Sequence, residues 1–221
     1  RGRAEIHQPR IVALPDEGVG MINRAQQLMT IGARKKDGAN LSFISRDGLR
    51  GDDYYPTPPS ATRALLSVES FTGPIWEPAC GDGAISEVLK LAGHTVISTD
   101  LVERKYGTGR IDFLMETKPL APNIITNPPY KNAQDFAERA VFLTTGKVAF
   151  LMRLVWLEGS KRRKFFESSR LSRVWVFSKR LPRMHRPDYS GPKTTSAIAF
   201  AWFVWEHGYV GKPELGWIDP K

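Results

Sequence analysis

Short apolar runs alternate along the chain with stretches in which apolar residues recur at helical spacing. Near-continuous apolar runs, such as those at 175–177 and 197–205, are typical of strands covered on both faces. The order of runs and amphipathic stretches predicts an α/β fold. Strands are predicted at 74–76, 95–100, 123–126, 147–154, 173–178 and 197–206, and helices at 84–91, 133–143 and 160–167.

The first part of the chain follows a different pattern. One helix is predicted at 16–29, and a stretch rich in Gly, Lys and Asp follows at 32–53. We therefore expect an N-terminal extension at 1–50, of unknown role, ahead of a single catalytic domain at 51–221. Packing on the domain, oligomerisation and contact with DNA through the basic residues at 34–36 are alternative roles for this extension.

The segment Thr-Asn-Pro-Pro-Tyr at 126–130 carries the clearest chemical signal. It follows the apolar run at 123–126, which places it at the carboxyl end of a strand, where ligands bind in open α/β sheets. The side-chain oxygen of Asn127 and the carbonyl of Pro128 can accept both N–H bonds of an exocyclic amino group. Tyr130 offers a face on which a flat base can stack. The segment predicts methylation of an amino nitrogen, with a simple turn as the alternative interpretation.

A glycine loop separates the first predicted strand from the first helix of the domain. It reads Glu-Pro-Ala-Cys-Gly-Asp-Gly at 77–83, and Gly81 and Gly83 allow a sharp turn and the close approach of a ligand. The next strand ends in Asp100, 23 positions after Glu77, where a carboxylate can bind ribose hydroxyls. This arrangement predicts a nucleotide-like ligand at the loop.

A third acid, Asp112, is followed by Phe113 in a region predicted to be a loop. There the acid could read an adenine amino group while the aromatic ring covers the base, and a solvated surface acid is the alternative interpretation.

Together these segments resemble the class I S-adenosylmethionine-dependent methyltransferases, specifically the DNA adenine-N6 group, and look most like its small phage and prophage forms. The resemblance covers about residues 50–218. It implies a Rossmann-like fold, with a mostly parallel seven-stranded sheet and helices on both faces. It also implies methyl transfer to the N6 amino group of adenine by base flipping. The implied catalytic residues are Asn127, Pro128, Pro129 and Tyr130.

The resemblance further implies how S-adenosylmethionine is bound. The glycine loop is similar to the cofactor motif of that group, and the Tyr-Pro-Thr-Pro segment at 55–58 resembles the element that contacts the methionine end of the cofactor. The expected cofactor-binding residues are Tyr55, Thr57, Pro58, Glu77, Pro78, Ala79, Cys80, Gly81, Gly83, Asp100, Leu101, Asp112 and Phe113.

The positive charge is concentrated after the catalytic motif. The chain carries a formal charge of +9, and the segment 153–193 contains 12 Lys or Arg against three acids, so this segment accounts for the whole excess. A phosphate backbone would pass there, although a solvated basic helix face is the alternative interpretation. The proline-rich basic loop at 179–196 reads as a functional loop, in which Met184 or Tyr189 could fill the gap left by a flipped base.

Double-stranded DNA is therefore the expected partner. Because the elements after residue 130 are needed to complete the sheet, little chain is left for reading a target, and we expect short or relaxed sequence specificity. The expected nucleic-acid-binding residues are Lys161, Arg162, Arg163, Arg180, Arg183, His185, Arg186 and Lys193.

The remaining composition adds little chemistry. No metal-binding cluster and no apolar run of about 18 residues stands out, so neither a metal nor a membrane is expected. A single cysteine, Cys80, suits a reducing cytoplasm, here that of a bacterium or a phage-infected host. The oligomeric state is open. Alternative functions are methylation of RNA bases, methylation of a protein glutamine amide, and nucleic-acid binding without catalysis.

Overall fold

The computed structural model describes residues 54–182, 184, 190 and 195–220, and the structural statements below refer to these residues. The predicted helix at 16–29, the extension at 1–50 and Asp53 lie outside them, as do Arg183, His185, Arg186, Tyr189 and Lys193. Their expected roles stay predictions.

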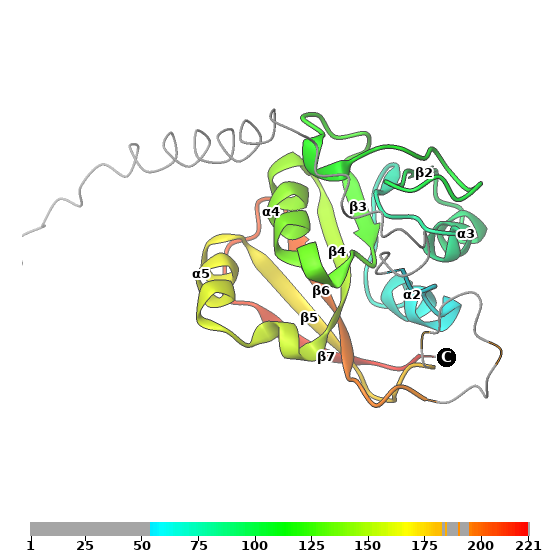
Figure 1. The fold of residues 1–221 in the computed structure, drawn as a ribbon. Helices are drawn as coiled ribbons and strands as arrows, with labels where there is room; N and C mark the ends of the chain where they lie inside the picture. The colour runs from blue at the N-terminus through cyan, green and yellow to red at the C-terminus, as the bar shows by residue number, and fades with distance from the viewer. Residues whose placement is uncertain (1–53, 183, 185–189, 191–194, 221) are drawn as a thin grey trace, which may run out of the picture. The chain divides into compact units, whose positions relative to one another are not determined.

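The described residues form a sheet of seven strands in the order β2-β1-β3-β4-β6-β5-β7 (Figure 1). Strand β6 is antiparallel to both of its neighbours, β4 and β5, and the other neighbouring pairs are parallel. The predicted mostly parallel, seven-stranded sheet is confirmed. The strands are β1 (Ile75–Glu77), β2 (Val96–Ser98), β3 (Asn123–Thr126), β4 (Lys147–Arg153), β5 (Leu171–Phe177), β6 (Phe200–Glu206) and β7 (Glu214–Ile218).

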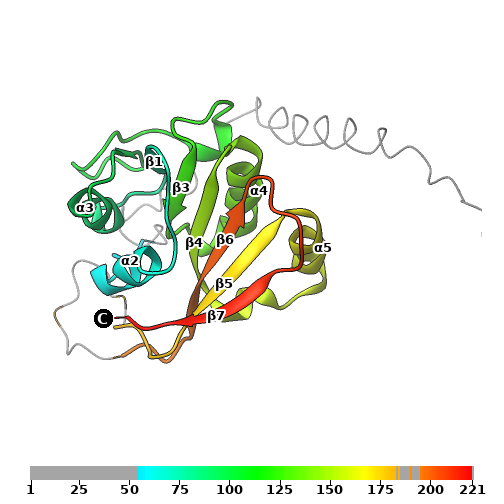
Figure 2. The ribbon, with the colours of Figure 1, turned by 180° about the vertical axis from the view of Figure 1, so that it is seen from behind.

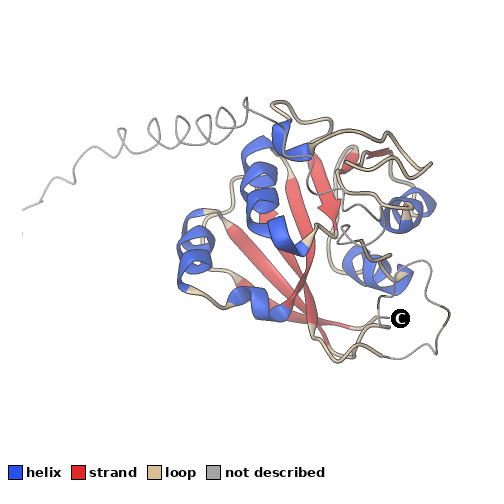
Figure 3. Cartoon of the chain, in the orientation of Figure 1, coloured by secondary structure: helices blue, strands red, loops and turns tan. Residues whose placement is uncertain are grey.

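Helices cover both faces of the sheet, as predicted. One buried cluster joins α4 and α5 to one face, and a second joins α2 and α3 to the other (Figure 3). The helices are α2 (Pro59–Leu66), α3 (Ala84–Leu91), α4 (Ala133–Leu143) and α5 (Ser160–Ser168), with 3-10 turns η2 (Phe113–Met115), η3 (Tyr130–Asn132) and η4 (Leu154–Leu157).

Strand β4 shows why the central strands read as unbroken apolar runs. Val148 and Phe150 point into the cluster with α4 and α5, whereas Ala149 and Leu151 point into the cluster with α2 and α3. Since successive side chains of a strand alternate between faces, a strand covered on both sides needs apolar residues at every position.

The sequence pattern missed strand β7, which pairs with β5 at the edge of the sheet (Figure 2). Leu215 and Trp217 are mostly exposed, and between them Gly216 lies under the ring of Trp175, where a Cβ would come within 2.2 Å of Cζ3. An exposed edge strand with a central glycine lacks the buried alternation that predicts strands. None of the described helices is long and apolar enough to cross a membrane.

Candidate active site

Strands β1, β2, β3 and β4 run in parallel, so the segments that follow them lie at one edge of the sheet. These segments begin with Pro78, Thr99, Asn127 and Leu154. The sequence motifs therefore come together at this edge, although they are far apart in the chain.

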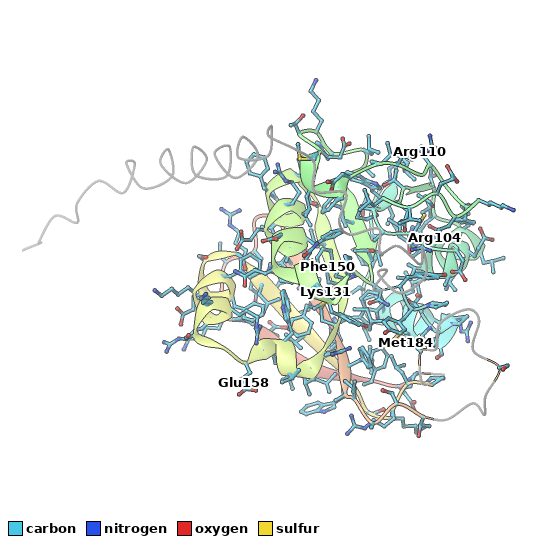
Figure 4. All side chains as sticks on the ribbon, in the orientation of Figure 1. Arg104, Arg110, Lys131, Phe150, Glu158 and Met184 are labelled. Atoms are coloured by element: carbon cyan, nitrogen blue, oxygen red, sulfur yellow. The ribbon has the colours of Figure 1, made fainter. Side chains whose placement is uncertain are left out.

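The amide of Asn127 is held by the segment that precedes α2. Its Nδ2 donates to the hydroxyl of Thr57 at 3.1 Å and lies 3.4 Å from the carbonyl oxygen of Tyr55. The sulfur of Met184, which is labelled in Figure 4, lies 3.8 Å from the same nitrogen. One residue of the basic loop therefore contacts the catalytic motif. The Oδ1 atom of Asn127 is buried and has no hydrogen-bond partner among the described residues. An unsatisfied buried carbonyl oxygen costs about 1–3 kcal/mol, which a donor from a ligand would recover.

The ring of Tyr130 lies next to a cation. The guanidinium of Arg153, at the end of β4, is 4.5 Å from the ring centroid, and the ring of Phe200 is tilted at 6.4 Å. Tyr130 is half-buried, and Pro129 before it is extended, with φ −58° and ψ 122°. The motif thus leaves the strand along an extended backbone, as two consecutive prolines require.

The glycine loop follows β1 and enters α3. Gly81 and Gly83 have φ of +58° and +87°, in the left-handed region that favours glycine. A Cβ on Gly81 would come within 2.2 Å of the Tyr54 ring, and one on Gly83 within 2.3 Å of the Tyr106 ring. The glycines were predicted to admit a ligand. The structure shows aromatic rings of the chain itself packed against both.

Asp100 ties the second strand to the glycine loop. Its Oδ2 accepts from the backbone N–H of Gly81 and its Oδ1 from that of Val102, each at 2.8 Å. Leu101, beside it, is 61% exposed and offers an apolar surface at the loop. Arg104 lies nearby, with its guanidinium 4.4 Å from the Tyr54 ring centroid. A glycine loop bonded to an acid on the next strand, beside an exposed apolar side chain, fits an adenosine-containing cofactor.

Glu77, expected to bind the cofactor, points into the protein below the loop. The residue is 2% exposed, and its carboxylate accepts from the hydroxyl of Ser86, which also lies 2.6 Å from the hydroxyl of Ser98. Burial raises the pKa of Glu77 well above its usual range. Burial, together with the charges of Glu77 and Asp100, raises the pKa of the Cys80 thiol to about 12.

The two residues expected to contact adenine, Phe113 and Asp112, lie in different environments. Phe113 is 1% exposed, and its ring packs edge-on against Trp76 and at 5.0 Å from Phe136. The Phe113 ring is thus part of the hydrophobic core, and its expected role over the adenine ring stays a prediction. Asp112 is exposed and accepts from the backbone N–H of Leu114, where it caps η2.

The expected nucleic-acid-binding residues that the structure describes lie at the surface. Lys161 and Arg163 on α5 are exposed, as is Arg180 at the start of the basic loop. Arg163 pairs with Glu167 one turn later, and Arg162 donates to the backbone carbonyl of Glu158. These placements are compatible with phosphate contacts and do not test them.

Sequence reasoning missed two contacts of the site. Arg153 was counted only as part of the basic segment, and Thr57 was expected to contact the cofactor, not Asn127. The sequence did hold a signal for the contact between Thr57 and Asn127. Tyr55, Thr57 and Asn127 each precede a proline and are thereby confined to extended backbone. No sequence signal pointed to the contact between Arg153 and Tyr130.

Comparison with known proteins supports the fold. The chain matches no protein-family model and no curated protein sequence. It is similar in structure to a proposed RNA methyltransferase from Pyrococcus horikoshii, with a TM-score of 0.51 and 14% identity over 82% of this chain and 98% of that one. A weaker likeness joins it to the 23S rRNA methyltransferase ErmE, with a TM-score of 0.47 and 13% identity over 72% of this chain and 71% of that one. The fold is thus the Rossmann-like methyltransferase fold that the sequence predicted.

Proposed function

We propose that the protein is an S-adenosylmethionine-dependent methyltransferase that modifies the N6 amino group of adenine in DNA. One observation carries the proposal. The Oδ1 of Asn127 is buried without a partner, at the carboxyl end of β3 and within the Asn-Pro-Pro-Tyr segment. A buried acceptor without a partner is suited to an N–H donor of the substrate.

The residues around the glycine loop would hold the cofactor. Gly81 and Gly83 would let the cofactor approach the backbone once the rings of Tyr54 and Tyr106 move aside, and the carboxylate of Asp100 would accept from the ribose hydroxyls, as the acid at this place does in related sheets. Leu101 offers an apolar contact to the adenine ring. When bound, S-adenosylmethionine supplies an electrophilic methyl group on a sulfonium sulfur.

The catalytic segment would activate the target amine. Asn127 accepts one N–H bond of the amino group, and the carbonyl of Pro128 accepts the other, so that the nitrogen lone pair is left to attack. Tyr130 stacks on the flipped base and fixes its plane. The nitrogen gains the methyl group and loses one proton to water, so no general base is needed.

The charge distribution supports a nucleic-acid substrate. All of the positive excess of the chain lies within 153–193, and Met184 of that segment contacts Asn127. A basic segment that contacts a base-type motif through Met184 favours a phosphodiester over a glutamine amide. Duplex DNA is the partner we propose, with short or relaxed sequence specificity.

The substrate class can be tested with tritium-labelled S-adenosylmethionine. Duplex DNA, single-stranded DNA, RNA and a glutamine-containing peptide are incubated separately, and the label in each polymer is counted. We expect label in duplex DNA. Label in RNA alone or in the peptide alone would contradict the DNA assignment, and label in no polymer would contradict the enzymatic one.

A further inference from the structure

The neighbours of the Asn127 amide determine which way it points. The two orientations of an amide differ by a half-turn that exchanges oxygen and nitrogen. The carbonyl oxygen of Tyr55, 3.4 Å from Nδ2, can only accept a hydrogen bond, and the sulfur of Met184 at 3.8 Å is also an acceptor. A reversed amide would place Oδ1 against both of them, so the orientation with Oδ1 facing away is favoured.

Thr57 supplies the shortest of these contacts. Its hydroxyl oxygen is 3.1 Å from Nδ2, and the residue is 4% exposed, so water cannot easily replace the bond. A hydroxyl can donate or accept, and alone it would tolerate either orientation of the amide. The Tyr55 carbonyl therefore selects the orientation, and the Thr57 hydroxyl holds the amide in it.

We propose that Thr57 is a positioning residue for catalysis, which orients the Asn127 amide so that Oδ1 faces the amino group of the substrate. This inference rests on the proposed function. It differs from the role expected from sequence, in which Thr57 contacts the methionine end of the cofactor.

The backbone prepares this contact before any substrate binds. Tyr55, Thr57 and Asn127 each precede a proline, which confines all three to extended conformations. Helix α2, which begins two residues after Thr57, is anchored on the sheet by Ala61 and Leu65, both fully buried. A supporting group held by rigid elements keeps a reacting group in place, and this placement gives Thr57 that property.

Kinetics of Thr57→Val, which removes the hydroxyl at nearly constant volume, test the proposal. We expect kcat to fall about tenfold, the value of one neutral hydrogen bond, while KM for S-adenosylmethionine stays within about twofold. Thr57→Ser should restore kcat. The matched control is Thr62→Val, because Thr62 is also fully buried and lies in α2. An increase in the cofactor KM with unchanged kcat would instead assign Thr57 to cofactor binding and overturn the proposal.

Coupling to Asn127 gives a second kinetic test. If Thr57 acts through the amide, Thr57→Val should cause no further loss in an Asn127→Ala background. Independent, additive losses would contradict a positioning role. Thr57→Ala provides a second variant without the hydroxyl, should the valine side chain disturb folding.

A readout without turnover separates this proposal from the proposed function. In 15N-labelled protein, the Nδ2 protons of Asn127 should shift and exchange faster with solvent in Thr57→Val, whereas Thr62→Val should leave them unchanged. Unchanged Nδ2 resonances in Thr57→Val would overturn the positioning role. This measurement reports on the contact even if the wild-type protein methylates none of the substrates offered.

Discussion

The guanidinium of Arg153 lies over the ring of Tyr130, 4.5 Å from its centroid. A cation over an aromatic face stabilises the pair by about 0.5–2 kcal/mol, so Arg153 fixes the ring that we expect to stack on the target base. The Nε of Arg153 is buried and has no hydrogen-bond partner among the described residues. The contact joins the end of β4 to the catalytic segment after β3.

Replacement of Arg153 should therefore weaken substrate binding. We expect Arg153→Met to lower kcat/KM for DNA about tenfold, mainly through KM, because both the ring and a positive charge near the substrate lose support. Arg153→Lys should recover little, since an ammonium does not stack as a planar guanidinium does. The control is Lys161→Met, which removes an exposed charge of α5. Equal effects of Arg153→Met and Lys161→Met on kcat/KM would mean that only charge matters.

The buried carboxyl of Glu77 should make stability depend on pH. Burial raises its pKa in the folded protein, so the folded state holds the proton more tightly than the unfolded chain does. The free energy of unfolding should then fall as pH rises from 4.5, the ordinary pKa, towards the raised one. Glu77→Gln cannot ionise and should lose this decline. Thermal unfolding of the wild-type protein and of Glu77→Gln between pH 4 and 8 checks this decline. If the stabilities of the two proteins changed with pH in the same way, the predicted titration of Glu77 would be contradicted.

Glu69 should show the opposite pH dependence. Burial raises its pKa, but the hydrogen bonds from Arg173, Lys147 and Trp175 outweigh burial, and the net pKa is lowered. The stability that this network provides should be lost as pH falls below 4.5. Glu69→Gln takes a buried carboxylate out of this network, so that Lys147 loses its partner and Arg173 keeps only Glu206, and it should destabilise the fold by about 3 kcal/mol at pH 7. In urea titrations, the exposed Glu167→Gln control should change little, and equal midpoints for both variants would argue against the network.

The single thiol should be unreactive in the folded protein. Cys80 is 3% exposed and its pKa is raised to about 12, so almost no thiolate forms near neutral pH. We expect iodoacetamide at pH 8 to label the native protein negligibly within an hour, and to label it once per chain in urea. Intact-mass spectrometry distinguishes the two states. Rapid labelling of the native protein would show that the glycine loop opens.

The elements buried on both faces could be predicted from the sequence. The helix predicted at 133–143 is observed as Ala133–Leu143, and the apolar run at 197–206 contains β6, Phe200–Glu206. The spacing of the apolar residues along the chain predicts such elements, because the core accepts only apolar side chains at every inward position. The position of Asn127 at the end of a strand was predictable for the same reason.

Other features depend on contacts that no local pattern encodes. Strand β7 is exposed at the edge of the sheet, and α2 begins at Pro59, directly after the Tyr-Pro-Thr-Pro segment, where no helix was predicted. Phe113 follows an acid, as a ligand-contacting aromatic residue would, but Trp76 and Phe136 enclose it in the core. The orientation of the Asn127 amide likewise depends on the 55–57 segment, about 70 residues earlier in the sequence.

The identity of the methylated nucleoside tests the central claim most directly. Duplex DNA without methylated bases is incubated with S-adenosylmethionine and either the wild-type protein or Asn127→Ala, digested to nucleosides and analysed by mass spectrometry. The account predicts N6-methyladenine with the wild-type protein and a loss of at least about a hundredfold with Asn127→Ala, because the amine loses its acceptor. Methylation of another base, or N6-methyladenine formed equally well by Asn127→Ala, would contradict it.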